Sequence, residues 1–152
     1  MKKVIVLEPN RVLARQYVLA LGAAGFDVHW ASDGHMAVFT ADKNTPQVIV
    51  MELLIAGHSG IEFLYEFKTY KDWQAIPIVI LSMIPPHEIS GTPQALAALG
   101  VTHYLYKPHT TLKHLQNVVE AASKSLDMSV NSLDAPGTAL CRSVSATSAY
   151  AK

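Results

Sequence analysis

Three short apolar or aromatic segments that each end at a charged residue constrain the fold more than any other feature of the sequence. The segments, with the residues that end them, are Val4–Leu7 with Glu8, Val48–Met51 with Glu52, and Tyr104–Tyr106 with Lys107. Consecutive large or β-branched apolar residues are typical of a strand buried on both faces, as in a parallel sheet. Open α/β sheets place their binding crevice at the carboxyl ends of such strands. The three charged residues are therefore candidates for one common site.

The rest of the chain alternates between strand-like segments and segments of helical periodicity. Further strands are predicted at Phe26–Ala31 and at Ile78–Leu81, which ends at Ser82, and the last strand begins at Val101. Apolar residues at helical spacing predict helices from Arg11 to Gly22 or Gly25, from His35 to Asp42, from Gly60 to about Tyr70, from Pro93 to Gly100, and from Thr111 onward.

This alternation predicts an α/β fold with a flavodoxin-like, doubly wound, five-stranded parallel sheet and helices on both faces. Right-handed crossovers leave few topologies, and the strand order 2-1-3-4-5 suits strands of this number and length. In that order the carboxyl ends of strands one, three and five lie close together. We therefore expect Glu8, Glu52 and Lys107 to meet in one crevice, with Ser82 between the last two.

Composition sets the limits of the domain and excludes several classes of function. Residues 1–126 are predicted to form the domain, and residues 127–152, rich in Ser, Ala and Thr, a disordered tail. Twelve basic and twelve acidic residues balance, so no global charge draws the chain to nucleic acid or to an anionic membrane. The single cysteine, Cys141, excludes an intramolecular disulfide. The first apolar stretch is too short for a signal peptide or membrane span, which predicts a cytoplasmic protein.

The ordered set of these features resembles the CheY-like receiver domain of bacterial response regulators. The resemblance covers Lys2 to about Ser125. It is carried by the acidic ends of strands one and three, by Gly60, by Ser82 at the end of strand four, and by the sequence Tyr-Leu-Tyr-Lys-Pro from Tyr104 to Pro108.

The resemblance implies a role for each of these positions in two-component phosphorelay signalling. In the family, acids after strand one and an aspartate after strand three hold Mg²⁺, and the aspartate accepts a phosphoryl group from a histidine kinase. Ser82 and Lys107 match the residues that contact the phosphoryl group. Tyr104 matches an aromatic residue that changes rotamer and signals to a partner surface. Pro108 would follow a cis peptide bond.

Two substitutions remove family chemistry from this chain. The acidic pair has become Glu8-Pro9, and the phosphoacceptor position is Glu52 in place of aspartate. Since Mg²⁺ demands near-ideal octahedral geometry, the remaining candidates (Glu8, Glu52 and the backbone of Leu54) predict a weak site at most, and no cofactor is expected. A nucleophile displaced by about 1 Å can lose on the order of a hundredfold in rate. We therefore expect a binding protein and not an enzyme.

Two interpretations of Glu52 remain open at this stage. Its longer side chain can reach Lys107 and Ser82 and hold the domain in an active-like conformation with Tyr104 turned inward, or the substitution has no further role at an inactive site. The first function predicted is a stand-alone atypical receiver that binds a histidine kinase or downstream signalling protein through the last two helices and strand five. The alternatives are a phosphorylatable regulator with an unusual acceptor, and a small flavodoxin-like enzyme or ligand-binding protein. The oligomeric state is not predicted.

Overall fold

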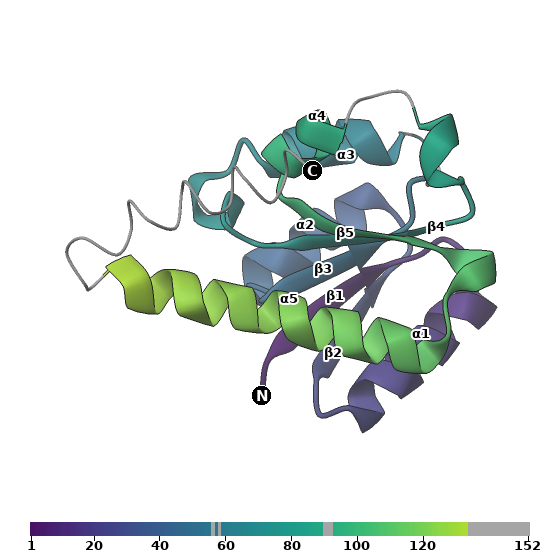
Figure 1. The fold of residues 1–152 in the computed structure, drawn as a ribbon, viewed down its shortest axis with the longest axis horizontal. Coiled ribbons are helices and arrows are strands. Elements are labelled where there is room, and N and C mark those ends of the chain that lie inside the picture. Colours follow the sequence, from purple (N-terminus) through teal and green to yellow (C-terminus); the bar gives the residue numbers. More distant parts are fainter. Residues whose placement is uncertain (56, 58, 90–92, 134–152) are drawn as a thin grey trace.

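A five-stranded parallel sheet forms the centre of the chain (Figure 1). The computed structural model describes residues 1–55, 57, 59–89 and 93–133. The strands are β1 Lys3–Leu7, β2 Asp27–Ala31, β3 Val48–Met51, β4 Ile78–Ser82 and β5 Val101–Tyr106. Their order is β2-β1-β3-β4-β5, and every pair is parallel, which confirms the predicted doubly wound topology.

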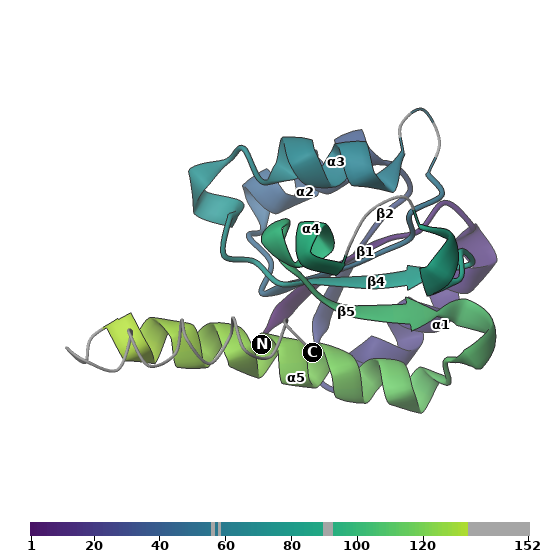
Figure 2. The same ribbon diagram turned by 45° about the horizontal axis from the view of Figure 1, so that its top comes forward.

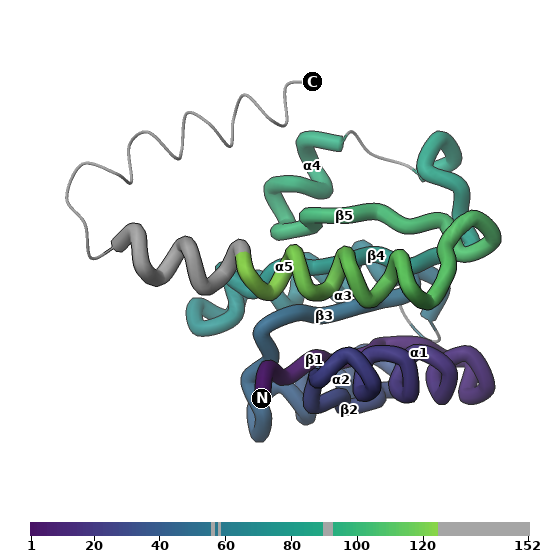
Figure 3. Tube along the Cα trace, turned by 60° about the horizontal axis from the view of Figure 1, so that its bottom comes forward, coloured from purple at the N-terminus to yellow at the C-terminus, as the bar shows by residue number. Residues whose placement is uncertain are grey.

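Helices cover both faces of this sheet (Figures 1 and 2). They are α1 Arg11–Ala23, α2 Gly34–Lys43, α3 Gly60–Phe67, α4 Pro93–Ala98 and α5 Leu112–Leu133, with short 3-10 helices η1 Lys71–Trp73, η2 Pro86–Glu88 and η3 Lys107–His109. Helices α1 and α5 lie together on one face, as Figure 3 also shows, while α2, α3 and α4 lie on the other. No helix within the described ranges is long and apolar enough to cross a membrane.

Two apolar layers explain the unbroken apolar runs in β1, β3 and β4. Val4 and Val6 pack in the layer beneath α1 and α5, whereas Ile5 and Leu7 pack in the layer beneath α2 and α3. Successive side chains of a strand point to opposite faces, so a strand covered on both faces needs apolar residues at every position.

Local hydrogen bonds fix where the helices begin. The side chain of Asn10 accepts from the backbone of the first turn of α1, and Asp33 does the same for α2. Ser59 and Glu62 form a reciprocal capping box at the start of α3. The hydroxyl of Thr111 accepts from the backbone N–H of His114, which confirms the predicted start of α5.

Two element boundaries differ from the prediction by more than two residues. Helix α3 ends at Phe67 and not near Tyr70, because the chain folds back and the Lys68 ammonium donates to the carbonyls of Trp73, Gln74 and Ile76 at 3.2, 3.1 and 2.6 Å. Helix α5 continues to Leu133, past the predicted domain boundary at residue 126. The remainder of the predicted tail, residues 134–152 with Cys141, lies outside the described residues.

Candidate functional site

The carboxyl ends of β1, β3 and β5 bring two carboxylates and one ammonium group into direct contact. Lys107 Nζ lies 2.9 and 3.1 Å from the two carboxylate oxygens of Glu8, and 2.6 Å from Oε2 of Glu52. The side chains are almost completely buried, with exposed fractions of 3%, 4% and 8% for Glu8, Glu52 and Lys107. The contact predicted from strand order is therefore present as a buried cluster of three charges.

The sheet register places the two acids side by side. Leu7 pairs with Met51, so the next residue of each strand, Glu8 and Glu52, leaves the sheet at the same level. The backbone N–H of Glu52 donates to the carbonyl of Leu7 at 2.9 Å and extends the pairing by one bond. Lys107 follows β5 at the same edge of the sheet and reaches both acids.

Glu52 accepts hydrogen bonds from a complete ring of donors. Besides Lys107, the Ser82 hydroxyl makes a short hydrogen bond to Oε1. The backbone N–H of Leu54 donates to Oε1 at 3.1 Å, and that of Met83 donates to Oε2 at 3.2 Å. Both oxygens thus accept from donors at or just after the carboxyl ends of β3, β4 and β5, and these contacts hold the side chain toward Lys107.

Burial and hydrogen bonding shift the pKa values of the three charged groups in different ways. Burial opposes ionisation of Glu52, but hydrogen bonds from Lys107, Ser82 and Leu54 outweigh it and lower the pKa of Glu52 below its ordinary value of 4.5. Burial raises the pKa of Glu8 above 4.5, because Lys107 compensates only part of the desolvation. Burial also acts against the charge of Lys107, yet the hydrogen bonds to Glu52 and Glu8 raise the pKa of Lys107 above 10.5.

The loop after β4 connects this cluster to Tyr104. The Ser82 hydroxyl accepts from the backbone N–H of Ile84 at 3.1 Å, and the hydroxyl of Tyr104 donates to the Ile84 carbonyl at 2.6 Å. Tyr104 is half-buried and packs against the apolar layer beneath α3. Its ring is therefore turned toward the loop, as the hypothesis of an inward aromatic requires.

A proline directly follows two of the charged residues, Pro9 after Glu8 and Pro108 after Lys107. Pro9 is exposed and offers no ligand atom in its side chain, as expected from its type. The prediction for Pro108 is wrong, since all described peptide bonds are trans. Lys107 and Pro108 open η3, where the N–H of Thr110 donates to the Lys107 carbonyl at 3.2 Å, and a trans proline fits this first turn.

Trp30 also supports the charged cluster, a role that was not predicted from the sequence. Its indole N–H donates to the backbone carbonyl of Glu8 at 2.9 Å and fixes the residue that carries the buried carboxylate. The signal lay in its position near the carboxyl end of β2, since β2 was expected to pair with β1.

The carboxylate oxygens of this cluster do not fit a Mg²⁺ site. Both oxygens of Glu8 contact Lys107, and both oxygens of Glu52 accept from protein donors. Magnesium requires oxygen ligands in octahedral arrangement, and here an ammonium group already lies between the two carboxylates. Across the described ranges, no group of three or more His, Cys, Asp or Glu side chains is arranged to hold a metal ion.

Comparison with known proteins agrees with this fold. The probable transcriptional regulatory protein TcrX of Mycobacterium tuberculosis is 27% identical over 79 residues, which are 52% of this chain and 33% of TcrX, so the chain matches about a third of that relative's length. The chemotaxis protein CheY4 of Vibrio cholerae has the same fold, with a TM-score of 0.71 and 24% identity over 80% of this chain and 98% of CheY4. The receiver domain of the Francisella response regulator 1452 gives a TM-score of 0.69 and 25% identity over 82% of this chain and 98% of that domain.

The family described as response regulator receiver domain matches residues 4–120, which include all of the sheet except its first residue, Lys3, and the cluster around Lys107. The fold and the strand order agree with this match. The chain therefore belongs to the response regulator receiver domains of two-component signalling.

Proposed function

We propose that this receiver domain signals by protein binding without phosphorylation, because the carboxylate of Glu52 takes the place of a phosphoryl group. The observation that carries the proposal is the ring of donors on Glu52. Ser82 and Lys107, whose equivalents in the family contact the phosphoryl group, already bind this carboxylate, together with the N–H of Met83. The groups that would bind a phosphoryl group therefore already bind the Glu52 carboxylate in the unphosphorylated protein.

Phosphorylation of Glu52 itself is disfavoured by the same contacts. Phosphoryl transfer depends on positioning of the nucleophile and on neutralisation of charge by metal ions. The nucleophilic oxygens of Glu52 are occupied by donors, and the carboxylates that would hold Mg²⁺ are paired with Lys107. An incoming phosphoryl donor would have to break this buried cluster, which costs several kcal/mol.

The output surface follows from the connection to Tyr104. Ser82 links Glu52 to Ile84, whose carbonyl binds the Tyr104 hydroxyl, so Glu52 stabilises the inward position of the aromatic ring on β5. Strand β5 is an edge strand of the sheet and contacts α4 (Figure 1). Leu105 of β5 packs in the same apolar layer as Leu115 and Val118 of α5. The surface formed by α4, β5 and α5 is therefore our candidate for binding a histidine kinase or a downstream signalling protein.

Intact-mass measurement after incubation with acetyl phosphate and Mg²⁺ tests the phosphorylation-independent mode. We expect no adduct on the wild-type protein. An adduct on Glu52→Asp alone would support the proposal further, because it shows that the longer side chain closes the pocket. An adduct on the wild-type protein that is lost in Glu52→Gln would overturn it.

Hydrogen exchange tests the link to the output surface. Glu52→Gln removes the charge that holds Ser82 and Lys107, so the N–H of Ile84 is expected to exchange faster than in the wild-type protein. Glu120→Gln, an exposed carboxylate on α5, is the matched control and is expected to leave this N–H unchanged. Equal exchange at Ile84 in all three proteins would contradict the proposed connection.

A further inference from the structure

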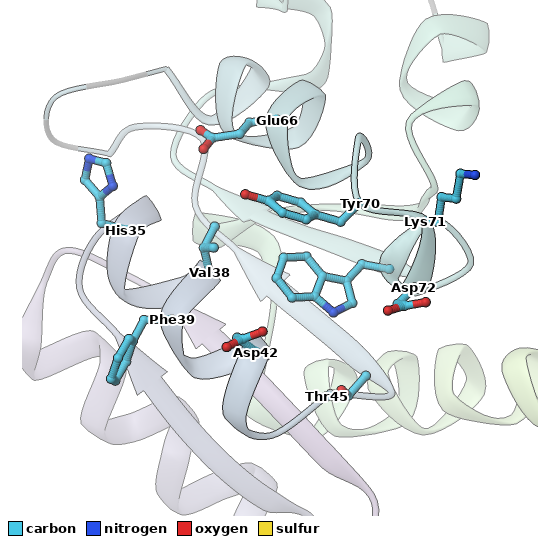
Figure 4. Close-up of a pocket in the computed structure, with 10 residues that line it drawn as sticks. His35, Val38, Phe39, Asp42, Thr45, Glu66, Tyr70, Lys71 and Asp72 are labelled. Atoms are coloured by element: carbon cyan, nitrogen blue, oxygen red, sulfur yellow. The ribbon is translucent and has the colours of Figure 1, made fainter.

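A groove of about 540 Å³ opens between α2 and the segment that leads from α3 into η1 (Figure 4). One end is lined by Asp42 and Thr45, which precede β3, and by Asp72, which precedes β4. These residues lie toward the amino ends of the strands, whereas Glu52 and Lys107 lie at the carboxyl ends. The groove is therefore separate from the charged cluster and is not part of the surface formed by α4, β5 and α5.

The wall of the groove is aromatic and anchored in the core. Trp73 is only 6% exposed, and its ring centroid lies 4.8 Å from that of Phe67, which is fully buried. Tyr70 packs on Trp73 with centroids 4.5 Å apart and leaves 43% of its surface exposed. Tyr70 thus presents a ring that is held in place from behind and accessible from the groove.

Three carboxylates surround this aromatic wall. Asp42 on α2, Glu66 on α3 and Asp72 on η1 all line the groove, and Figure 4 shows them on different sides of Tyr70. All three residues are exposed, and within the described part of the chain their side chains make no ion pair or hydrogen bond. Lys71 is the lysine among the lining residues, so the carboxylates exceed the ammonium groups.

We propose that this groove binds an arginine-containing segment of a partner protein. A guanidinium group is planar and permanently charged, so it can stack on the ring of Tyr70 and donate forked hydrogen bonds to carboxylates. Lysine carries the same charge but has no planar group that can stack on Tyr70. An acidic ligand would be repelled by the three carboxylates. The volume lies within the range of about 300–1,000 Å³ that is typical of ligand pockets.

This binding does not depend on the state of Glu52. The groove residues come from α2, α3, η1 and the loops that follow α2 and α3, whereas the cluster around Lys107 comes from the ends of β1, β3 and β5. The receiver would then carry two separate binding surfaces, one coupled to Tyr104 and one selective for cationic segments.

Fluorescence anisotropy with the full chain and labelled nonapeptides tests the proposal. The probes alternate glycine with arginine, with lysine or with glutamate. We expect the arginine peptide to bind several-fold more tightly than the lysine peptide, and the glutamate peptide not to bind. Asp42→Asn, Glu66→Gln and Asp72→Asn each remove one charge-assisted contact and are expected to weaken binding by about tenfold.

Two further variants separate the groove from general charge. Tyr70→Ser is expected to weaken binding of the arginine peptide and to leave the weaker binding of the lysine peptide nearly unchanged. Glu120→Gln on α5 removes an exposed carboxylate from the opposite face of the sheet and is expected to have no effect. Since the substituted residues are exposed, circular dichroism is expected to show wild-type folding for each variant.

Three results would overturn the proposal. The first is equal binding of the arginine and lysine peptides with no effect of Tyr70→Ser. The second is equal weakening by Glu120→Gln and by the groove variants, which would show that only net charge matters. The third is a self-association of the wild-type protein in sedimentation velocity that Asp42→Asn abolishes, because a second copy of the chain would then occupy the groove.

Discussion

Replacing Lys107 by methionine removes the cation that Glu8 and Glu52 share and keeps most of the apolar stem. Both carboxylates remain buried, and both lie within 2.9 Å of the position that Nζ occupied. Carboxylates less than about 6 Å apart repel by roughly 3 kcal/mol at an effective dielectric constant of about 20. Loss of one partner from a buried ion pair costs about 3–5 kcal/mol. We therefore expect the free energy of unfolding at pH 7 to fall by about 3–5 kcal/mol in Lys107→Met.

The size of this loss is expected to depend on pH. In the wild-type protein the folded-state pKa of Glu52 lies below 4.5, so its stabilising contribution is complete above that pH and is lost as the pH falls through the lower value. Without Lys107, burial and mutual repulsion raise the folded-state pKa values of both acids above their unfolded values. Their destabilising effect is then present at neutral pH and is relieved as the pH falls, so the gap between variant and wild type narrows.

Urea denaturation followed by circular dichroism at pH 7 and pH 4.5 measures both effects. We expect the midpoint of Lys107→Met at pH 7 to lie about 2 M below that of the wild-type protein. Lys113→Met, an exposed lysine on α5, is the control and is expected to change stability by less than about 0.5 kcal/mol. A second substitution, Glu8→Gln, is expected to restore part of the loss. A stability of Lys107→Met within about 1 kcal/mol of wild type at both pH values would refute the reasoning.

Further predictions concern the aromatic link and two glycines. Tyr104→Phe removes the hydrogen bond to the Ile84 carbonyl and is expected to lower the free energy of unfolding by about 1 kcal/mol, with faster exchange in the loop after β4. Gly60→Ala places a Cβ 2.6 Å from the backbone Cα of Leu53, so we expect a loss of about 1–3 kcal/mol in urea denaturation. In Gly22→Ala, the added Cβ lies inside α1 with no other atom within 4 Å. We expect this variant to gain about 0.5–1 kcal/mol in the free energy of unfolding and to melt at a higher temperature. Destabilisation by Gly22→Ala equal to that by Gly60→Ala would contradict the steric explanation.

Patterns within short stretches of sequence predicted the elements of the sheet. The apolar run Val48–Met51 corresponds to β3 without change, and Val101–Tyr106 corresponds to β5. Strand β3 is buried on both faces and is apolar at every position, whereas the edge strand β5 includes the half-buried Thr102 and His103. Helix ends were less accurate, because the end of α3 at Phe67 depends on three carbonyls that bind Lys68 from residues farther along the chain.

For the candidate site, the sequence predicted which residues come together but not the contacts that they make. Sequence patterns identify the residues that end the strands, and the predicted strand order places Glu8, Glu52, Ser82 and Lys107 near one another. Their hydrogen bonds and ion pairs follow only from the folded structure, because differences of about 1 Å in the positions of atoms on different strands decide which contacts form. Two glutamates of similar burial have pKa values shifted in opposite directions, since Glu52 accepts from Ser82 and two backbone N–H groups in addition to Lys107, whereas Lys107 compensates only part of the burial of Glu8.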